Sequence, residues 1–364
     1  MNSWGFKFYW NAPTFMCHQY GINFAEVTRD YGIIQNNNDS FRGNKIAILY
    51  DPGMFPALID NSTGVLQRRN GGVPQEGNLS KHLNLFQQHL NDQIDDNFSG
   101  LGIIDFESWR PIFRQHWMSL EIYKRLSIDI ERNRHPWSSE KILESIATKR
   151  FEKSGQMFMD ETLKLAKKLR PNAKWSYYAY PYCFNVSPNG PSHTQCSSQV
   201  QNENNRMSWL WTIEDILMPS VYLNSKLSGT DKLNLITGRI NEALRLIRRY
   251  NLKTEIMLYF WPKYQDNRRK YLDKEDVING FKAMINHNAD GTIIWSSSQD
   301  VNSRQKCEEF MNYLHNILGP AVLSAKLYAE HHYHKNVGEI ITNNNNKTSS
   351  VWFQDEIPYS ISTT

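Results

Sequence analysis

The 364-residue chain lacks several features that define common protein classes. Its longest apolar runs, such as residues 46–50 and 293–295, are far shorter than the ~18 residues needed to cross a bilayer. Charge is nearly balanced, with 41 basic and 37 acidic residues, an excess too small for an electrostatic nucleic-acid binder. We therefore expect neither a membrane nor a nucleic acid as a partner.

Cysteine is scarce, and no two cysteines form a Cys-x-x-Cys pair, so the sequence predicts no zinc site and no metal cofactor. Four cysteines allow two disulfides in three connectivities. One of these pairs Cys183 with Cys196 across a short loop and leaves Cys17 for Cys307. Spacing alone does not choose among the three.

A signal-peptide pattern is also missing, because residues 1–5 contain no basic segment followed by an apolar one. Asn-x-Ser/Thr sequons, which accept N-glycans in secreted proteins, occur about as often as chance gives. We expect a secreted protein, and the chain as a mature or truncated form of it. The predicted glycosylation sites are Asn38, Asn61, Asn78, Asn97 and Asn185, and a sixth sequon begins at Asn346.

Short apolar segments alternate with longer helical ones along most of the chain. Helical periodicity marks residues 140–169 and 232–250, between segments that read as strands. This alternation predicts an α/β fold, and we expect a parallel barrel of seven or eight strands. The predicted strands lie in residues 6–12, 45–51, 100–107, 174–182, 216–223, 255–261 and 291–298. We assign residues 1–326 to this single catalytic domain and expect residues 327–364 to be a disordered tail.

The segment Gly100–Glu107 carries the clearest chemical signal, since an apolar strand ends in two acids, Asp105 and Glu107. Residues i and i+2 of a strand share a face, and carboxyl ends of barrel strands carry catalytic groups. Two adjacent carboxyls resist double ionisation, which raises a pKa and creates a general acid. Acids also end strands without a catalytic role, so the pattern leaves both interpretations open.

Aromatic residues are abundant, with 17 Phe, 11 Trp and 18 Tyr, and several follow predicted strands. Such rings, gathered on one rim, favour a groove for sugars, which stack on flat apolar faces. The alternative is that they anchor the barrel lip. The strand-end clusters are Tyr50-Asp51, Tyr177-Tyr178, Tyr222 and Trp295-Ser-Ser-Ser298.

Six motifs together resemble the hyaluronidases of glycoside hydrolase family 56, above all the short insect venom form. The most specific is Asp105-Phe-Glu-Ser-Trp-Arg-Pro111, and the similarity extends over residues 6–323. The resemblance implies a distorted TIM-like barrel and a secreted endo-β-N-acetylhexosaminidase that cuts the β1,4 bonds of hyaluronan. We expect a monomer. The other motifs begin at Tyr9, Tyr50, Gly71, Tyr178 and Pro219.

The resemblance also implies individual roles. Glu107 matches the proton donor, and Asp105 matches the acid that orients the substrate's acetamido group. That group's oxygen attacks the anomeric carbon, a substrate-assisted retaining route without a protein nucleophile. Tyr178 and Tyr222 hold the same group, and Trp295 forms an apolar wall. Further substrate-binding positions are Tyr50, Asp51, Ser297, Ser298 and Arg239.

Two points stay open within the resemblance. Arg239 matches a basic position that either binds substrate or holds the barrel by an ion pair. The substrate is hyaluronan or, as an alternative, chondroitin, which shares the alternating hexosamine and uronic acid plan. An inactive glycan-binding homologue is a third interpretation, against which the presence of both acids argues. The implied disulfides are Cys17–Cys307 and Cys183–Cys196.

Overall fold

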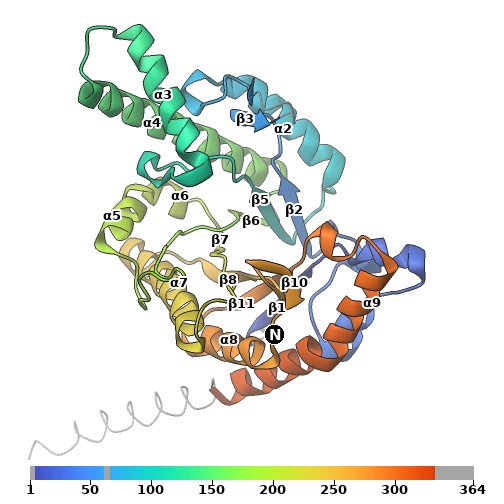
Figure 1. Cartoon of the computed structure of the whole chain (residues 1–364). Helices are drawn as coiled ribbons and strands as arrows, with labels where there is room; N and C mark the ends of the chain where they lie inside the picture. Colours follow the sequence, from blue (N-terminus) through green and yellow to red (C-terminus); the bar gives the residue numbers. More distant parts are fainter. Residues whose placement is uncertain (1–4, 61–65, 333–364) are drawn as a thin grey trace, which may run out of the picture.

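The computed structural model describes residues 5–60 and 66–332, and at its centre parallel strands form a ring (Figure 1). Two parallel sheets make up this ring, and each of their strands lies within a predicted segment. The order in the first sheet is β1 (Lys7–Asn11), β11 (Gly291–Trp295), β8 (Glu255–Phe260) and β7 (Ile216–Leu217). The order in the second is β2 (Ile46–Tyr50), β5 (Leu101–Asp105) and β6 (Lys174–Tyr177).

Hydrogen bonds outside the strands join the two sheets. Between β6 and β7, the Asp215 amide donates to the Trp175 carbonyl at 3.0 Å. Between β1 and β2, the segment at Ile34 intervenes: the Trp10 amide donates to the Ile34 carbonyl at 2.8 Å, and Asn36 Nδ2 donates to the Ile46 carbonyl at 2.8 Å. The ring is therefore complete in space although its strand pairing is interrupted, which confirms the distorted TIM-like barrel.

The strands are apolar throughout because both of their faces are buried. Alternate residues of β2 and β5 point into the barrel, where Ile48 and Ile103 belong to an inner cluster, while Leu49 and Ile104 pack outward against helices. At Gly102, which pairs with Trp175, an added Cβ would lie 2.5 Å from the indole ring. Only glycine lets β5 and β6 pair there.

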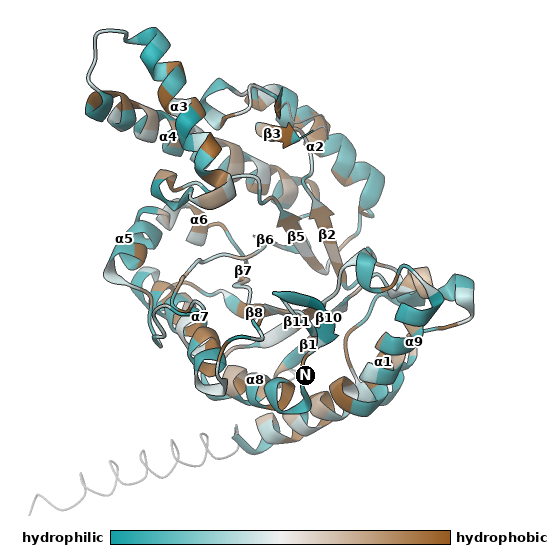
Figure 2. Cartoon of the chain, in the orientation of Figure 1, coloured by the Kyte–Doolittle hydropathy of each residue, from teal (hydrophilic) through white to brown (hydrophobic). Residues whose placement is uncertain are grey.

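Helices surround the ring and turn their apolar stripes toward it (Figure 2). The predicted helix 140–169 is confirmed as α4, and 232–250 is confirmed within α7, which starts earlier because Ser228 and Asp231 form a capping box. The helices are α1 (Glu26–Tyr31), α2 (Leu79–Gln93), α3 (Glu121–Arg134), α4 (Glu140–Leu169), α5 (Ser198–Arg206), α6 (Ser208–Trp211), α7 (Gly229–Tyr250), α8 (Lys274–Asn286) and α9 (Arg304–Tyr313). Short 3-10 helices cover Thr14–Tyr20, Asn37–Asp39, Pro74–Glu76, Phe113–Gln115, Met118–Leu120 and Ser298–Asp300, and a π-helical turn covers Leu314–Leu318.

Two antiparallel hairpins were missed by the sequence analysis. One joins β3 (Ala57–Asp60) to β4 (Leu66–Arg69), and the other joins β9 (Lys263–Tyr264) to β10 (Asn267–Tyr271). Figure 2 shows β10 as strongly hydrophilic. Strands without an apolar face leave no periodic signal, so sequence patterning cannot detect them.

The predicted disordered tail is wrong for residues 327–332, because the chain is helical over residues 319–332. Ala321, Ala325 and Ala329 recur every fourth residue and are buried, so one stripe of this helix packs on the core. Residues 333–364 lie outside the described part of the chain. None of the helices within residues 5–60 and 66–332 is long and apolar enough to cross a membrane.

Candidate active site

A cavity of about 940 Å³ opens at the carboxyl ends of the barrel strands. Asp105 ends β5 and Trp295 ends β11, while Glu107, Tyr178 and Tyr222 lie in the loops that follow β5, β6 and β7. All five line the cavity. The structure thus brings together residues that are up to 190 positions apart, on the face where α/β barrels place their functional groups.

The segment after β5 is held by its apolar residues. Phe106 stacks on Phe55 with ring centroids 4.1 Å apart, and the Trp109 indole donates to the Pro56 carbonyl at 2.8 Å. Both Phe106 and Trp109 are buried. Because these side chains anchor the backbone from behind, the carboxyls between and beside them face the cavity.

Asp105 and Glu107 form a coupled pair, joined by a hydrogen bond between their carboxyls. The pKa of Asp105 is raised well above its ordinary value, first by burial and then by the negative charge of Glu107. Burial also raises the pKa of Glu107, although its carboxyl is open to solvent inside the cavity. The pair therefore retains a proton at a pH where ordinary carboxyls have lost theirs.

Arg110, in the same motif, is a cavity residue that the sequence analysis missed. Its guanidinium lies 4.9 Å from the Tyr182 ring centroid and 5.2 Å from that of Phe184, and its Nη1 donates to the Gln115 carbonyl at 2.7 Å. Its positive charge lowers the pKa of Glu107 and so opposes the effect of burial. A basic residue three positions after the acid was the available signal.

Tyr178 and Tyr222 present hydroxyls beside the acids. The two rings lie side by side with their centroids 6.3 Å apart, and a phenol hydroxyl can both donate and accept a hydrogen bond. Burial raises the pKa of both phenols, so both stay protonated at neutral pH. Tyr222 in turn stacks on Trp295 at 5.8 Å, and Trp261 meets the Trp295 ring edge-on at 5.5 Å.

Trp261 is a second missed residue, although it follows β8 just as the predicted Trp295 ends β11. It lines the cavity and is nearly fully buried. Its indole nitrogen donates to Asp300 Oδ2 at 3.0 Å. Extending the strand-end argument to every predicted strand would have found it.

The other predicted substrate-binding residues do not all line the cavity. Ser297 lines the cavity, whereas Tyr50, Asp51 and Ser298 are absent from its described lining. The Tyr50 hydroxyl accepts a hydrogen bond from the Trp295 indole at 2.8 Å, so it orients that wall. Asp51 forms a bidentate ion pair with Arg69. Its charge raises the pKa of Asp105 from outside the cavity.

Arg239 extends from α7 into the cavity wall, half-buried beside Tyr178 and Tyr182. Its Nη1 donates to the Ser220 carbonyl, and its buried Nε has no hydrogen-bond partner within the described residues. Burial lowers its pKa to about 10, so it remains charged at neutral pH. No carboxylate pairs with it in the part of the chain that the structure describes, so the described residues supply no partner for the barrel-holding ion pair. Substrate binding stays a prediction.

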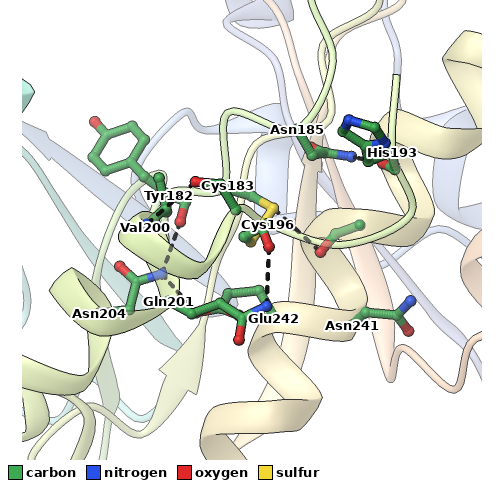
Figure 3. Close-up of a disulfide and its surroundings, with 12 residues drawn as sticks. Tyr182, Cys183, Asn185, His193, Cys196, Val200, Gln201, Asn204, Asn241 and Glu242 are labelled. Atoms are coloured by element: carbon green, nitrogen blue, oxygen red, sulfur yellow. Dashed lines mark hydrogen bonds between the residues drawn. A yellow bond between two sulfur atoms is a disulfide. The ribbon is translucent and has the colours of Figure 1, made fainter. Parts of the chain in front are cut away.

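Both disulfides implied by the resemblance are present, Cys17–Cys307 and Cys183–Cys196. The second closes a 13-residue loop beside the cavity (Figure 3). Behind it, Asn204 Nδ2 donates to the Tyr182 carbonyl at 2.9 Å and to Glu242 at 2.7 Å. The loop that presents Tyr182 is therefore tied covalently at one end and by hydrogen bonds to α5 and α7.

The predicted glycosylation of Asn185 conflicts with the structure. Its side chain is 2% exposed, and Nδ2 donates to the carbonyls of His193 (2.7 Å) and Asn234 (2.8 Å), which occupies both amide hydrogens. An N-glycan replaces one of them and has no room. Asn38, Asn78 and Asn97 are exposed and stay predicted sites, while Asn61 and Asn346 lie outside the described residues.

No group of three or more His, Cys, Asp or Glu side chains within residues 5–60 and 66–332 is arranged to hold a metal ion. The side chains of the cavity offer a carboxyl pair sharing a proton, phenol hydroxyls, indole faces and guanidinium groups. Together with the barrel, these define a glycosidase-type site, in which an acid protonates a leaving oxygen beside an aromatic sugar platform.

Comparison with known proteins specifies the class. The model of the hyaluronidase family, glycoside hydrolase family 56, matches residues 1–353, and the chain belongs to this family. It is 53% identical to a hyaluronidase of Apis mellifera over 87% of the chain and 83% of the relative, and 49% identical to one of Polistes annularis over 86% of each. The crystal structure of bee venom hyaluronidase in complex with a hyaluronic acid tetramer superposes with a TM-score of 0.85 at 53% identity, covering 87% of this chain and 98% of that one.

Proposed function

We propose that this chain is a hyaluronidase, an endo-β-N-acetylhexosaminidase that hydrolyses the β1,4 bonds of hyaluronan. The observation that carries the proposal is the hydrogen-bonded pair of Asp105 and Glu107 beside Tyr178 and Tyr222 in an aromatic-walled cavity. Family membership supports it, as does the hyaluronic acid tetramer bound to the bee venom enzyme. Glu107 is the general acid that protonates the leaving oxygen.

The placement of the acids favours the substrate-assisted route. A retaining enzyme with a protein nucleophile holds two carboxyls about 5 to 5.5 Å apart on opposite sides of the scissile bond. Asp105 and Glu107 instead share a hydrogen bond and approach from one side. Asp105 is therefore placed to orient the acetamido group, whose oxygen attacks the anomeric carbon, and not to attack the carbon itself.

Substrate binding moves the shared proton to the acid. In the empty site burial raises the pKa of both carboxyls, so the pair shares a proton. When the acetamido N–H donates to Asp105, that hydrogen bond stabilises the ionised form of Asp105, and the shared proton is then held by Glu107. The ionised Asp105 then stabilises positive charge that develops on the acetamido group, while the protonated Tyr178 hydroxyl donates a hydrogen bond to the same group.

A direct assay tests the proposal. Oligosaccharides released from hyaluronan should carry N-acetylglucosamine at the new reducing end, initially in the β configuration, and a thiazoline mimic of the cyclised intermediate should inhibit competitively. A glycosyl ester trapped on Asp105 with a fluorosugar would contradict the substrate-assisted route. Absence of hyaluronan cleavage by the wild-type protein would overturn the function as a whole.

Secretion, the monomeric state and cleavage of chondroitin belong to the proposal as well. Two disulfides support secretion, since such bonds persist in oxidising compartments. Light scattering of the purified chain should give the mass of a monomer. Release of oligosaccharides from unsulfated chondroitin, measured beside hyaluronan, determines which hexosamine epimer the enzyme prefers.

A further inference from the structure

The β9–β10 hairpin forms part of the cavity wall on the side of Trp261. Lys263, Gln265, Arg268 and Arg269 all line the cavity. The hairpin contributes four basic residues within eight positions, namely Lys263, Arg268, Arg269 and Lys270. The proposed mechanism uses none of them, so their role needs its own explanation.

An irregularity in the hairpin pushes three cations out of the ladder. Asn267 pairs with Tyr264 and Tyr271 pairs with Lys263, so residues 268–270 have no counterpart in β9 and bulge outward. Bulges re-aim side chains and commonly lie next to active sites. Arg268, Arg269 and Lys270 are all exposed as a result.

The four cations differ in what neutralises them. Buried Lys263 pairs with Asp300 at 3.0 Å, and Lys270 pairs with Asp273 at 3.0 Å. Neither Arg268 nor Arg269 has an ion-pair partner among residues 5–60 and 66–332. The two cations without partners line the cavity, whereas the paired Lys270 of the same bulge does not.

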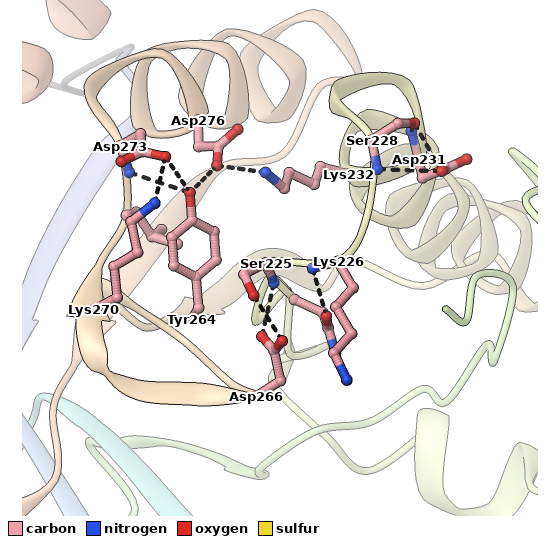
Figure 4. Close-up of polar contacts among 12 residues, drawn as sticks. Ser225, Lys226, Ser228, Asp231, Lys232, Tyr264, Asp266, Lys270, Asp273 and Asp276 are labelled. Carbon is pink, nitrogen blue, oxygen red and sulfur yellow. Dashed lines mark hydrogen bonds and ion pairs between the residues drawn. The ribbon is translucent and has the colours of Figure 1, made fainter. Parts of the chain in front are cut away.

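Contacts at both ends of the hairpin hold it in place (Figure 4). At the turn, Asp266 accepts hydrogen bonds from the Ser225 amide and hydroxyl, each at 2.7 Å. At the base, the Tyr264 hydroxyl donates to Asp273 at 2.9 Å and also contacts Asp276, which pairs with Lys232. The backbone that carries the two arginines is therefore positioned before any ligand arrives.

Arg268 continues the aromatic wall of the site. Its guanidinium carbon lies 5.8 Å from the Trp261 ring centroid, and Trp261 meets Trp295 behind the acetamido-binding tyrosines. The aromatic wall and the two arginines without ion-pair partners among the described residues therefore belong to one cavity. In hyaluronan the neighbouring sugar is a uronate, which carries one carboxylate.

We propose that Arg268 and Arg269 bind the carboxylate of a uronate next to the reacting hexosamine and thereby select uronate-containing polysaccharides over neutral hexosamine polymers. This inference rests on the proposed function and deepens it. A guanidinium presents a planar fork that matches a carboxylate, and an unpaired one gives up no internal partner when it binds. The interaction lies at an open cavity rim, so salt weakens it.

The test compares the double variant Arg268→Gln/Arg269→Gln with Lys270→Gln, its matched control in the same bulge. The double variant should raise KM for hyaluronan about three- to tenfold at low salt, with kcat changed less than about twofold, because two exposed ion pairs are lost. This difference should shrink toward ~1 M salt, where the Debye length is about 3 Å. Lys270→Gln should behave as the wild type, and Arg268→Lys/Arg269→Lys should restore part of the affinity.

A neutral ligand separates the carboxylate from the rest of the sugar. Carboxyl-reduced hyaluronan oligosaccharides, used as competitive inhibitors, should bind equally to the wild type and the double variant. An unchanged KM and salt dependence in the double variant, or an equal loss in Lys270→Gln, would overturn the inference while hyaluronan cleavage by the wild type still upholds the proposed function. Calorimetric binding of a hyaluronan tetramer to the same variants tests the inference even where cleavage fails.

Discussion

The floor of the cavity and its β9–β10 wall use charge in opposite ways. On the floor, Asp105 and Glu107 are coupled: burial raises the pKa of both, and the charge of Glu107 raises that of Asp105 further. On the wall, Arg268 and Arg269 are exposed and have no ion-pair partner among the described residues. Proton transfer requires a carboxyl poised to hold a proton, whereas capture of a polyanion requires a cation that is always charged and unpaired.

The largest expected effect is the loss of turnover when the general acid on the cavity floor is removed. Glu107→Gln keeps the shape of the side chain and removes the acid, so kcat should fall by ~10² to 10⁴. Hyaluronan binding, measured by calorimetry, should change little. Near-normal turnover in this variant would show that the proton comes from another group.

The second effect concerns the coupling between the two acids. Asp105→Asn should lower kcat by about 10², since the developing charge loses its stabilising carboxylate. It also removes the negative neighbour that resists ionisation of the pair. Activity requires a proton on Glu107 and is lost as pH rises through the upper pKa of the pair, so the alkaline limb of the kcat–pH profile should move to lower pH.

The control for this shift is the wild-type profile at the same ionic strength. An alkaline limb that stays in place, or moves upward, would mean that Asp105 does not raise the upper pKa of the pair. The floor would then lack the electrostatic coupling that distinguishes it from the wall.

The third effect tests the part of the cavity wall that the Cys183–Cys196 disulfide supports. Cys183→Ser/Cys196→Ser opens a 13-residue loop, and the free energy of unfolding should fall by about 2 to 3 kcal/mol. KM should rise because Tyr182 and its stacked Arg110 lose one anchor, while kcat should change less. Denaturant titration and steady-state kinetics measure the two effects, and an equal loss in kcat and kcat/KM would place this loop with the catalytic floor.

The smallest effect refines the account of the hairpin. Asp266→Ala removes the two hydrogen bonds to Ser225 while leaving both arginines in place. Because a loosened hairpin must be ordered when the substrate binds, KM should rise about two- to threefold with the salt dependence retained. A loss of salt dependence here would indicate that the variant displaces the arginines altogether.

The same two regions explain how far sequence reasoning reached. The strands of the ring were predictable because parallel strands buried on both faces read as continuous apolar runs. Asp105 and Glu107 were predictable because they end such a run and lie two residues apart. The hairpin was not, since β10 is Asn-Arg-Arg-Lys-Tyr and offers no apolar alternation.

Other errors also arise from contacts between distant residues. Asn185 satisfies the glycosylation motif, but its side chain is buried and donates a hydrogen bond to the carbonyl of Asn234, 49 positions away. Arg239 occupies the predicted site without the predicted ion pair, because the described part of the fold brings the Ser220 carbonyl and no carboxylate to it. The helical stripe through Ala329 was hidden among polar residues that suggested a tail.

The sequence by itself determined the barrel, the acid pair and the tyrosines beside it, because each of these depends on local patterns of apolar and polar residues. Only the tertiary structure decided which cations are free to meet a ligand. Lys263 is neutralised by Asp300 and Asp51 by Arg69, and such pairings depend on the packing of separate segments. A charge becomes available for binding only when folding leaves it without a partner.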